Sequence, residues 1–136
     1  MVKVDIVYEG DLRCRLTHGP SGSQIITDAP ADNMGKAQAF SPTDLVGAAL
    51  GSCVLTVMGI VAQRHHVDMT GTAVSVVKEM VVTPVRRIST LNVDIQMAQG
   101  IPADKRALLE RAAHSCPVHA SLHPDVKVTI QLNYPD

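Results

Sequence analysis

The side chains of this sequence that could do chemistry are thiols, and two of them stand in unusual surroundings. Cys53 lies inside an apolar segment that carries no charged residue from position 45 to position 62. Cys116 directly precedes Pro117, and His119 follows one helical turn later. A deprotonated thiol is a nucleophile, a redox group and a metal ligand. These two positions therefore indicate redox chemistry, metal binding or simple packing.

Packing is the competing interpretation for each cysteine, because free cysteines are often buried as small hydrophobic residues. It suits Cys53 in its apolar segment. Cys116 is either the last apolar position of the preceding helix or the N-cap of the short helix that follows, where backbone N–H groups would stabilise its thiolate. Cys14 alternates with Leu12 and Leu16 along an expected strand, so we expect it to be a core residue.

A metal or a bound cofactor is not expected. Cys53, Cys116 and His119 could form a zinc site, but no C-x-x-C pair supports one. The Walker loop, the G-x-G-x-x-G loop and the G-x-S-x-G turn are likewise missing from the sequence. The thiols are therefore the main chemical signal.

The composition excludes several other classes of function. The 136 residues fit one domain, 1–136. The net charge of −1 without a basic stripe, and the aromatic content of 2%, argue against nucleic acid as a partner. The first residues lack the apolar run of a signal peptide. We therefore expect a cytoplasmic protein with reduced cysteines.

Hydrophobic periodicity indicates an α+β fold with antiparallel sheets, helices on one face and the order βββα-ββααβ. The long apolar helix begins with a capping box, in which Ser41 is the N-cap, Pro42 the first helical residue and Asp44 the closing acid. The remaining expected elements are strands at 2–8, 12–16 and 24–30, strands at 72–82, 86–98 and 126–134, and helices at 41–66, 102–115 and 117–122.

The long helix at 41–66 could be a membrane span or a core helix. Its uncharged run is at the lower limit of length for a span and has no flanking aromatic residues. We therefore expect no membrane contact, and a central helix buried on nearly every face. Gly47 and Gly51 form a small-xxx-small pair, which favours either two such helices meeting in a homodimer or close packing within the chain.

Two segments, taken together, closely resemble the OsmC/Ohr family of osmotically inducible and organic hydroperoxide resistance proteins. The first is "FSPTDLVGAALGSCVLTVMGIVA", which contains Cys53, and the second is "AAHSCPVHASL", which contains Cys116. The order of expected elements agrees with that family across essentially the whole chain.

The resemblance implies an intertwined homodimer with long central helices and a cysteine-based hydroperoxide reductase that uses no metal or cofactor. Cys53 would be the peroxidatic thiol and form a sulfenic acid. Cys116 would resolve it as a disulfide, which an external dithiol would reduce. The substrate would be a small organic hydroperoxide. The alternative is a dimer of the same fold that acts as a thiol redox sensor or binds a small molecule.

One departure from the family pattern concerns the activation of Cys53. The peroxidases of the family carry a Glu ten residues before this Cys, which orients an Arg over the thiolate. Here that position is Thr43, and Asp44 follows it. The N-terminal strands offer Arg13 first and Arg15 second. We therefore expect a modest peroxidase, slower than members that have the Glu.

Overall fold

The computed structural model describes all residues, Met1–Asp136, and divides into two compact units. The first unit is Met1–Val46 and the second is Gly47–Asp136. The expectation of a single domain, 1–136, stays a prediction.

The first unit is a three-stranded antiparallel meander of β1 (Val4–Gly10), β2 (Arg13–His18) and β3 (Gln24–Asp28), followed by the 3-10 turn η1 (Ala31–Asn33). Leu12, expected in the second strand, lies in the preceding turn with a positive φ of 63°. Cys14 pairs with Tyr8 across β1 and β2 and is only half-buried. Cys14 is therefore not the core residue that the sequence predicts, because the face of the sheet on which it lies is not fully covered.

The second unit holds a sheet with the strand order β4-β5-β6. Its elements are α1 (Pro42–Arg64), which starts in the last residues of the first unit, then β4 (Ala73–Val81), β5 (Arg87–Gln96), η2 (Ala103–Lys105), α2 (Arg106–Ala113), α3 (Pro117–Ser121) and β6 (Lys127–Asn133). The helix expected at 102–115 is thus a 3-10 turn followed by a shorter α-helix.

The strand pairing of this sheet corrects the expectation that all strands are antiparallel. β4 and β5 form an antiparallel pair, but β6 runs parallel to β5. A parallel pair needs a crossover connection of a dozen or more residues. The segment between β5 and β6 provides one, because it carries α2 and α3.

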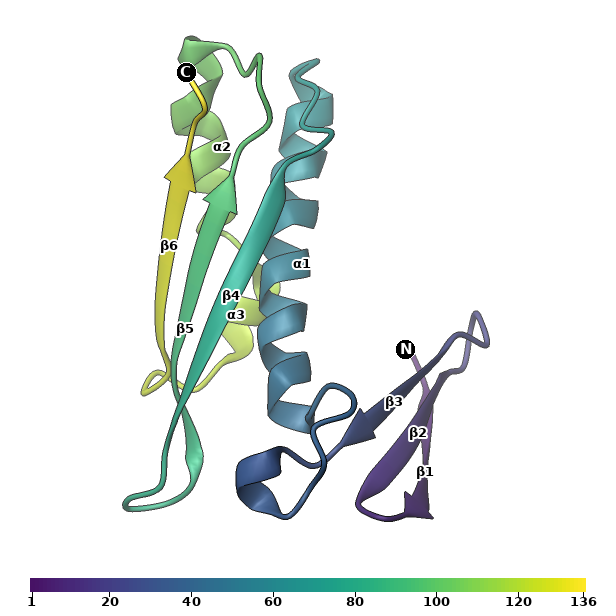
Figure 1. Cartoon of the computed structure of the whole chain (residues 1–136). Helices are drawn as coiled ribbons and strands as arrows, with labels where there is room; N and C mark the ends of the chain where they lie inside the picture. The colour runs from purple at the N-terminus through teal and green to yellow at the C-terminus, as the bar shows by residue number, and fades with distance from the viewer. The chain divides into compact units, whose positions relative to one another are not determined.

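The core of the second unit lies between α1 and the inner face of the sheet. In the view of Figure 1, α1 and α2 lie behind β4, β5 and β6. A stripe of α1 that includes Leu50, Val54 and Met58 is fully buried, as are Leu91 and Ile95 of β5. Burial of a residue of this size stabilises a fold by roughly 1.5–3 kcal/mol. This stripe therefore sets how α1 is rotated against the sheet.

The glycine pair of α1 serves this contact with the sheet. A Cβ atom on Gly51 would lie 2.9 Å from Cγ2 of Val76, and one on Gly47 would lie 3.5 Å from Cδ2 of Leu91. Of the two expected roles, close packing within the chain is therefore the one that the structure shows. The pair does not support a contact between two copies of the helix.

The single chain does not bury α1 on nearly every face, and completion of that burial by a partner chain stays a prediction. Six of its residues are buried, and they form one stripe. On the other side Ile60 keeps 46% of its surface exposed. By length and composition alone α1 could span a membrane, but a core helix passes the same test. Its buried stripe packs on the sheet, as a core helix does.

The glycine contact generates a stability prediction that compares two positions of α1. Replacing Gly59 by Ala, where no atom lies within 4 Å of the new Cβ, should stabilise the protein by about 0.5–1 kcal/mol through helix propensity. Gly51→Ala meets the stiff side chain of Val76, and overpacking costs about 1–3 kcal/mol. Gly51→Ala should therefore be the less stable variant by at least about 1 kcal/mol.

Urea unfolding at one protein concentration measures both free energies of unfolding. Equal stabilisation by the two alanines would show that α1 does not approach the sheet closely at Gly51.

Candidate functional site

Cys53 and Cys116 come from distant parts of the sequence and meet in the second unit. Cys53 lies in the middle of α1 and is half-buried. Cys116 immediately precedes α3 and is 2% exposed. The two side chains are close enough for Cys53 to raise the pKa of Cys116, and both are free thiols. The structure thus brings together the two cysteines that the sequence singled out.

Cys116 is positioned by the helices on either side of it. Leu109, Ala112 and Ala113 of α2 are buried together with Cys116, which confirms the apolar stripe expected from their spacing. Cys116 is also the N-cap of α3, with extended backbone angles, and Pro117 follows as the first helical residue. Both structural roles considered for Cys116 are therefore correct, and together they fix its backbone.

The expected stabilisation of the Cys116 thiolate at a helix start is outweighed by burial. Burial raises the pKa of the Cys116 thiol above its usual value, and the side chain of Cys53 raises it further. The backbone N–H groups of His119 and Val118 act in the opposite direction, but they are the weaker influence. Cys116 therefore keeps its proton at neutral pH, because a charged thiolate is disfavoured where water is excluded.

A hollow of about 360 Å³ opens beside Cys116. It is lined by His114, Ser115, Cys116, His119 and Ala120. From the sequence, His119 is expected only as a possible metal ligand, and His114 has no expected role. Their positions, three and two residues from Cys116, could have indicated that both lie beside this thiol. No group of three or more His, Cys, Asp or Glu side chains is placed to hold a metal ion.

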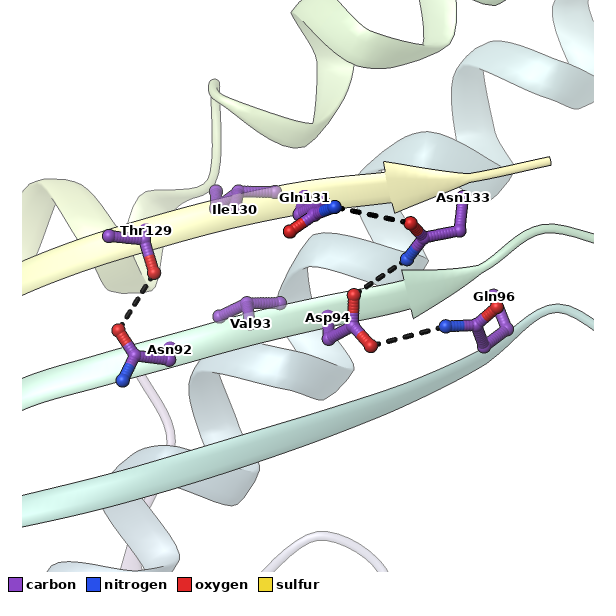
Figure 2. A pocket seen from close by; sticks show the side chains of 8 residues that line it. All are labelled: Asn92, Val93, Asp94, Gln96, Thr129, Ile130, Gln131 and Asn133. Carbon is purple, nitrogen blue, oxygen red and sulfur yellow. Dashed lines mark hydrogen bonds between the residues drawn. The ribbon is translucent and has the colours of Figure 1, made fainter.

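A larger groove lies on the opposite, outer face of the sheet and is not a chemical site. It has a volume of about 600 Å³ and contains neither cysteine nor histidine. Figure 2 shows that its polar side chains bind one another: Thr129 donates to Asn92 at 2.8 Å, and Asp94 accepts from Gln96 and Asn133. This network fits a solvated sheet face.

Arg13, the first candidate for activating Cys53, is engaged by groups of the first unit. Its guanidinium donates to the side-chain oxygen of Gln38 and lies 3.5 Å from a carboxylate oxygen of Asp28. Asp28 is 1% exposed. The N–H donated by Gln38, followed by the charge of Arg13, lowers the pKa of Asp28 although burial opposes this. Arg15, the second candidate, pairs with Glu9 at 3.1 Å.

Thr43 and Asp44 belong to the first turn of α1, as the capping box requires. The backbone N–H of Ser41 donates to Oδ2 of Asp44 at 2.9 Å, and the N–H of Asp44 donates to Oγ of Ser41 at 3.1 Å. The predicted capping box is therefore confirmed. The hydroxyl of Thr43 lies 3.2 Å from that of Ser41. A part for Thr43, Asp44 or Arg13 in chemistry at Cys53 stays a prediction.

Two neighbouring thiols of this kind can form a disulfide when one of them is oxidised. The half-buried Cys53 is the more accessible, and the buried Cys116 is held in its protonated form. The two thiols therefore differ in their accessibility. A division between a reacting thiol and a resolving thiol requires such a difference.

Comparison with protein families finds a match to the family model described as OsmC-like protein over residues 35–131. This range contains both cysteines of the site. No curated protein matches the sequence.

Comparison with solved structures finds the same fold in several bacterial proteins. A protein of Psychrobacter arcticus, provisionally named an osmotic stress induced and detoxification response protein, has a TM-score of 0.91 and 40% identity, covering 98% of this chain and 96% of that one. Organic hydroperoxide resistance proteins of Legionella pneumophila (TM-score 0.78, 14% identity, 98% and 96% covered) and Bacillus subtilis (0.71, 16%, 98% and 98%) share the fold.

The ion pair of Arg13 generates a prediction on acid stability. The pKa of Asp28 is lower in the folded chain than the usual 3.8, so its ionised form stabilises the fold. That stabilisation is present above the unfolded pKa and is lost as the pH falls through the folded pKa. Asp28→Asn should therefore destabilise the protein at pH 6, and the difference from wild type should shrink as the pH falls below 3.8 through the folded pKa of Asp28.

Urea unfolding across this pH range measures the effect. Asp11→Asn, at an exposed turn position, is the matched control and should show no comparable trend. If the loss of unfolding free energy in Asp28→Asn does not change with pH, the ionised form of Asp28 does not stabilise the fold as described.

Proposed function

Because this chain belongs to the OsmC-like protein family, we propose that it is a thiol-dependent peroxidase that reduces organic hydroperoxides. The family match, and the shared fold of proteins named for organic hydroperoxide resistance, support a role in peroxide resistance. The observation that carries the finer proposal is the close approach of the two thiols, through which Cys53 raises the pKa of Cys116. It supports a peroxidatic and a resolving thiol within one unit.

The first step is attack by the thiolate of Cys53 on the terminal oxygen of the hydroperoxide. The O–O bond breaks, Cys53 becomes a sulfenic acid, and the alkoxide takes a proton and leaves as the alcohol. Cys53 is the better candidate for this step because it is the less buried of the pair. Its place on an apolar helix favours a substrate with an apolar tail.

The second step joins the two sulfurs. The sulfur of Cys116 attacks the sulfenic acid, the S–O bond breaks, and water leaves with the proton of the Cys116 thiol. The raised pKa of Cys116 supports this role, since the thiol still holds the proton that makes water the leaving group. An external dithiol then reduces the disulfide and closes the cycle.

One observation favours the alternative, a thiol redox sensor or small-molecule binder with little turnover. Position 43 is Thr, and the guanidinium of Arg13 is already bound to Asp28 and Gln38. A neighbouring cation promotes the thiolate, which is the reactive form of a cysteine. Sustained consumption of an alkyl hydroperoxide in the presence of a dithiol separates the peroxidase from this alternative.

We further propose that the working form is a homodimer. Its support is apolar surface that the single chain leaves open. Ile60 of α1 and Ile6 of β1 are exposed by 46% and 61%. Single exposed apolar residues are ordinary, but a sheet face and a helix face of this kind indicate an interaction surface. Val4, Tyr8 and Ile25 belong to the same exposed set.

Serine variants test the division between the two thiols. Cys53→Ser should abolish the oxidation of the protein by an alkyl hydroperoxide, because serine is not a nucleophile for peroxide. Cys116→Ser should still consume one equivalent and stop at a sulfenic acid on Cys53, which a sulfenic-acid reagent detects by mass spectrometry. Cys14→Ser should turn over like wild type.

The proposal fails if Cys53→Ser is oxidised as fast as wild type. It also fails if Cys116→Ser does not react even once, since the first step does not need Cys116.

The oligomeric state is tested by sedimentation at micromolar concentration. Wild type should sediment with twice the 14.5 kDa mass of one chain. Ile60→Asp, at a position exposed in the single chain, should shift the protein toward the monomer, because a buried unpaired carboxylate is costly. A monomeric wild type at this concentration would refute the homodimer.

A further inference from the structure

We propose that the hollow lined by His114 and His119 is the entrance for the reducing dithiol, which attacks the sulfur of Cys116 rather than that of Cys53. This inference rests on the proposed function, because it concerns the disulfide that the peroxidase cycle would form. It adds which sulfur is attacked, from which side, and which side chains handle the proton.

The position of the hollow is the first argument. Cys116 forms part of its wall, whereas Cys53 does not border it. The hollow therefore reaches the residue that carries the resolving sulfur, whose side chain is itself almost fully buried. Its volume of about 360 Å³ lies at the lower end of the range for small-molecule pockets. It suits a small dithiol better than a protein surface.

Leaving-group chemistry is the second argument. In thiol–disulfide exchange the sulfur with the lower thiol pKa leaves faster. Burial raises the pKa of Cys116, so Cys116 is a poor leaving group, and attack at its own sulfur postpones its expulsion to the second, intramolecular exchange. A new bond forms between the reductant and Cys116, the bond between Cys116 and Cys53 breaks, and its electron pair goes to Cys53.

The second thiol of the reductant then completes the reaction. It attacks the reductant's own sulfur in the mixed disulfide, the bond to Cys116 breaks, and a cyclic disulfide leaves. The dithiol has lost two electrons and two protons, and both cysteines are thiols again. The hollow holds the dithiol through both exchanges. A reductant with only one thiol would need a second molecule to bind before the second exchange.

The two imidazoles are the third argument. His114 follows the last turn of α2, and His119 lies in α3. Both line the hollow, one on each side of Cys116 in the sequence. Imidazole accepts and returns protons near neutral pH. These side chains are therefore placed to take the proton of the incoming thiol and to return one to the sulfur of Cys116.

A trapping experiment identifies the attacked sulfur. The wild-type disulfide is made with diamide, so that the result does not depend on peroxide turnover. It is treated with limiting 2-mercaptoethanol, quenched with N-ethylmaleimide and mapped by peptide mass spectrometry. We expect the mercaptoethanol on Cys116 and the maleimide on Cys53. The reverse pattern, or equal amounts on both, would overturn the proposal.

A rate measurement tests the histidines. The double variant His114→Gln, His119→Gln should have its diamide-made disulfide reduced by dithiothreitol about tenfold more slowly than wild type, a small part of the usual acid–base effect. His123→Gln, with a side chain 70% exposed and outside the hollow, is the control and should match wild type. Full formation of the disulfide in each variant shows that the fold is intact.

The two proposals fail separately in these experiments. A double variant that is reduced as fast as wild type overturns the entrance, whatever peroxide does. The wild-type disulfide made with diamide could instead behave as expected while no alkyl hydroperoxide oxidises the protein. That result would overturn the peroxidase and leave the reductant entrance supported.

Discussion

The close approach of α1 to its sheet at Gly51 is the contact on which the rest of the second unit depends. A Cβ at this position would lie 2.9 Å from Cγ2 of Val76, so any larger residue would force a shift there. The approach lets Leu50 and Val54 fill the core, and it fixes the rotation and depth of the helix turn that carries Cys53. The apolar stripe of α2 fixes Cys116 in the same way. The thiol pair is thus held by packing.

Packing also decides the electrostatics of the pair. The start of α3 aims two backbone N–H groups at Cys116, yet burial outweighs them and the thiol stays protonated. A cation near a thiol favours its thiolate, but Arg13, the first candidate for this role at Cys53, is bound to Asp28.

The sequence predicted what depends on local patterns. The capping box at Ser41 and Asp44, and Cys116 as both stripe residue and N-cap, were readable because they involve neighbours along the chain. The parallel pairing of β6 was not, because alternation is the same in both strand directions. Nor could the glycine spacing say whether a sheet or a second helix approaches α1. The pKa of Cys116 depends on how deeply it is buried, which no local pattern contains.

The central claim is that Cys53 and Cys116 form one redox pair. The most direct test is peptide mapping of the wild-type protein after one equivalent of an alkyl hydroperoxide, with the alcohol product measured in the same sample. The account predicts one equivalent of alcohol, one disulfide between Cys53 and Cys116, and a free Cys14. A disulfide that contains Cys14, or alcohol formed without loss of either thiol, would contradict it.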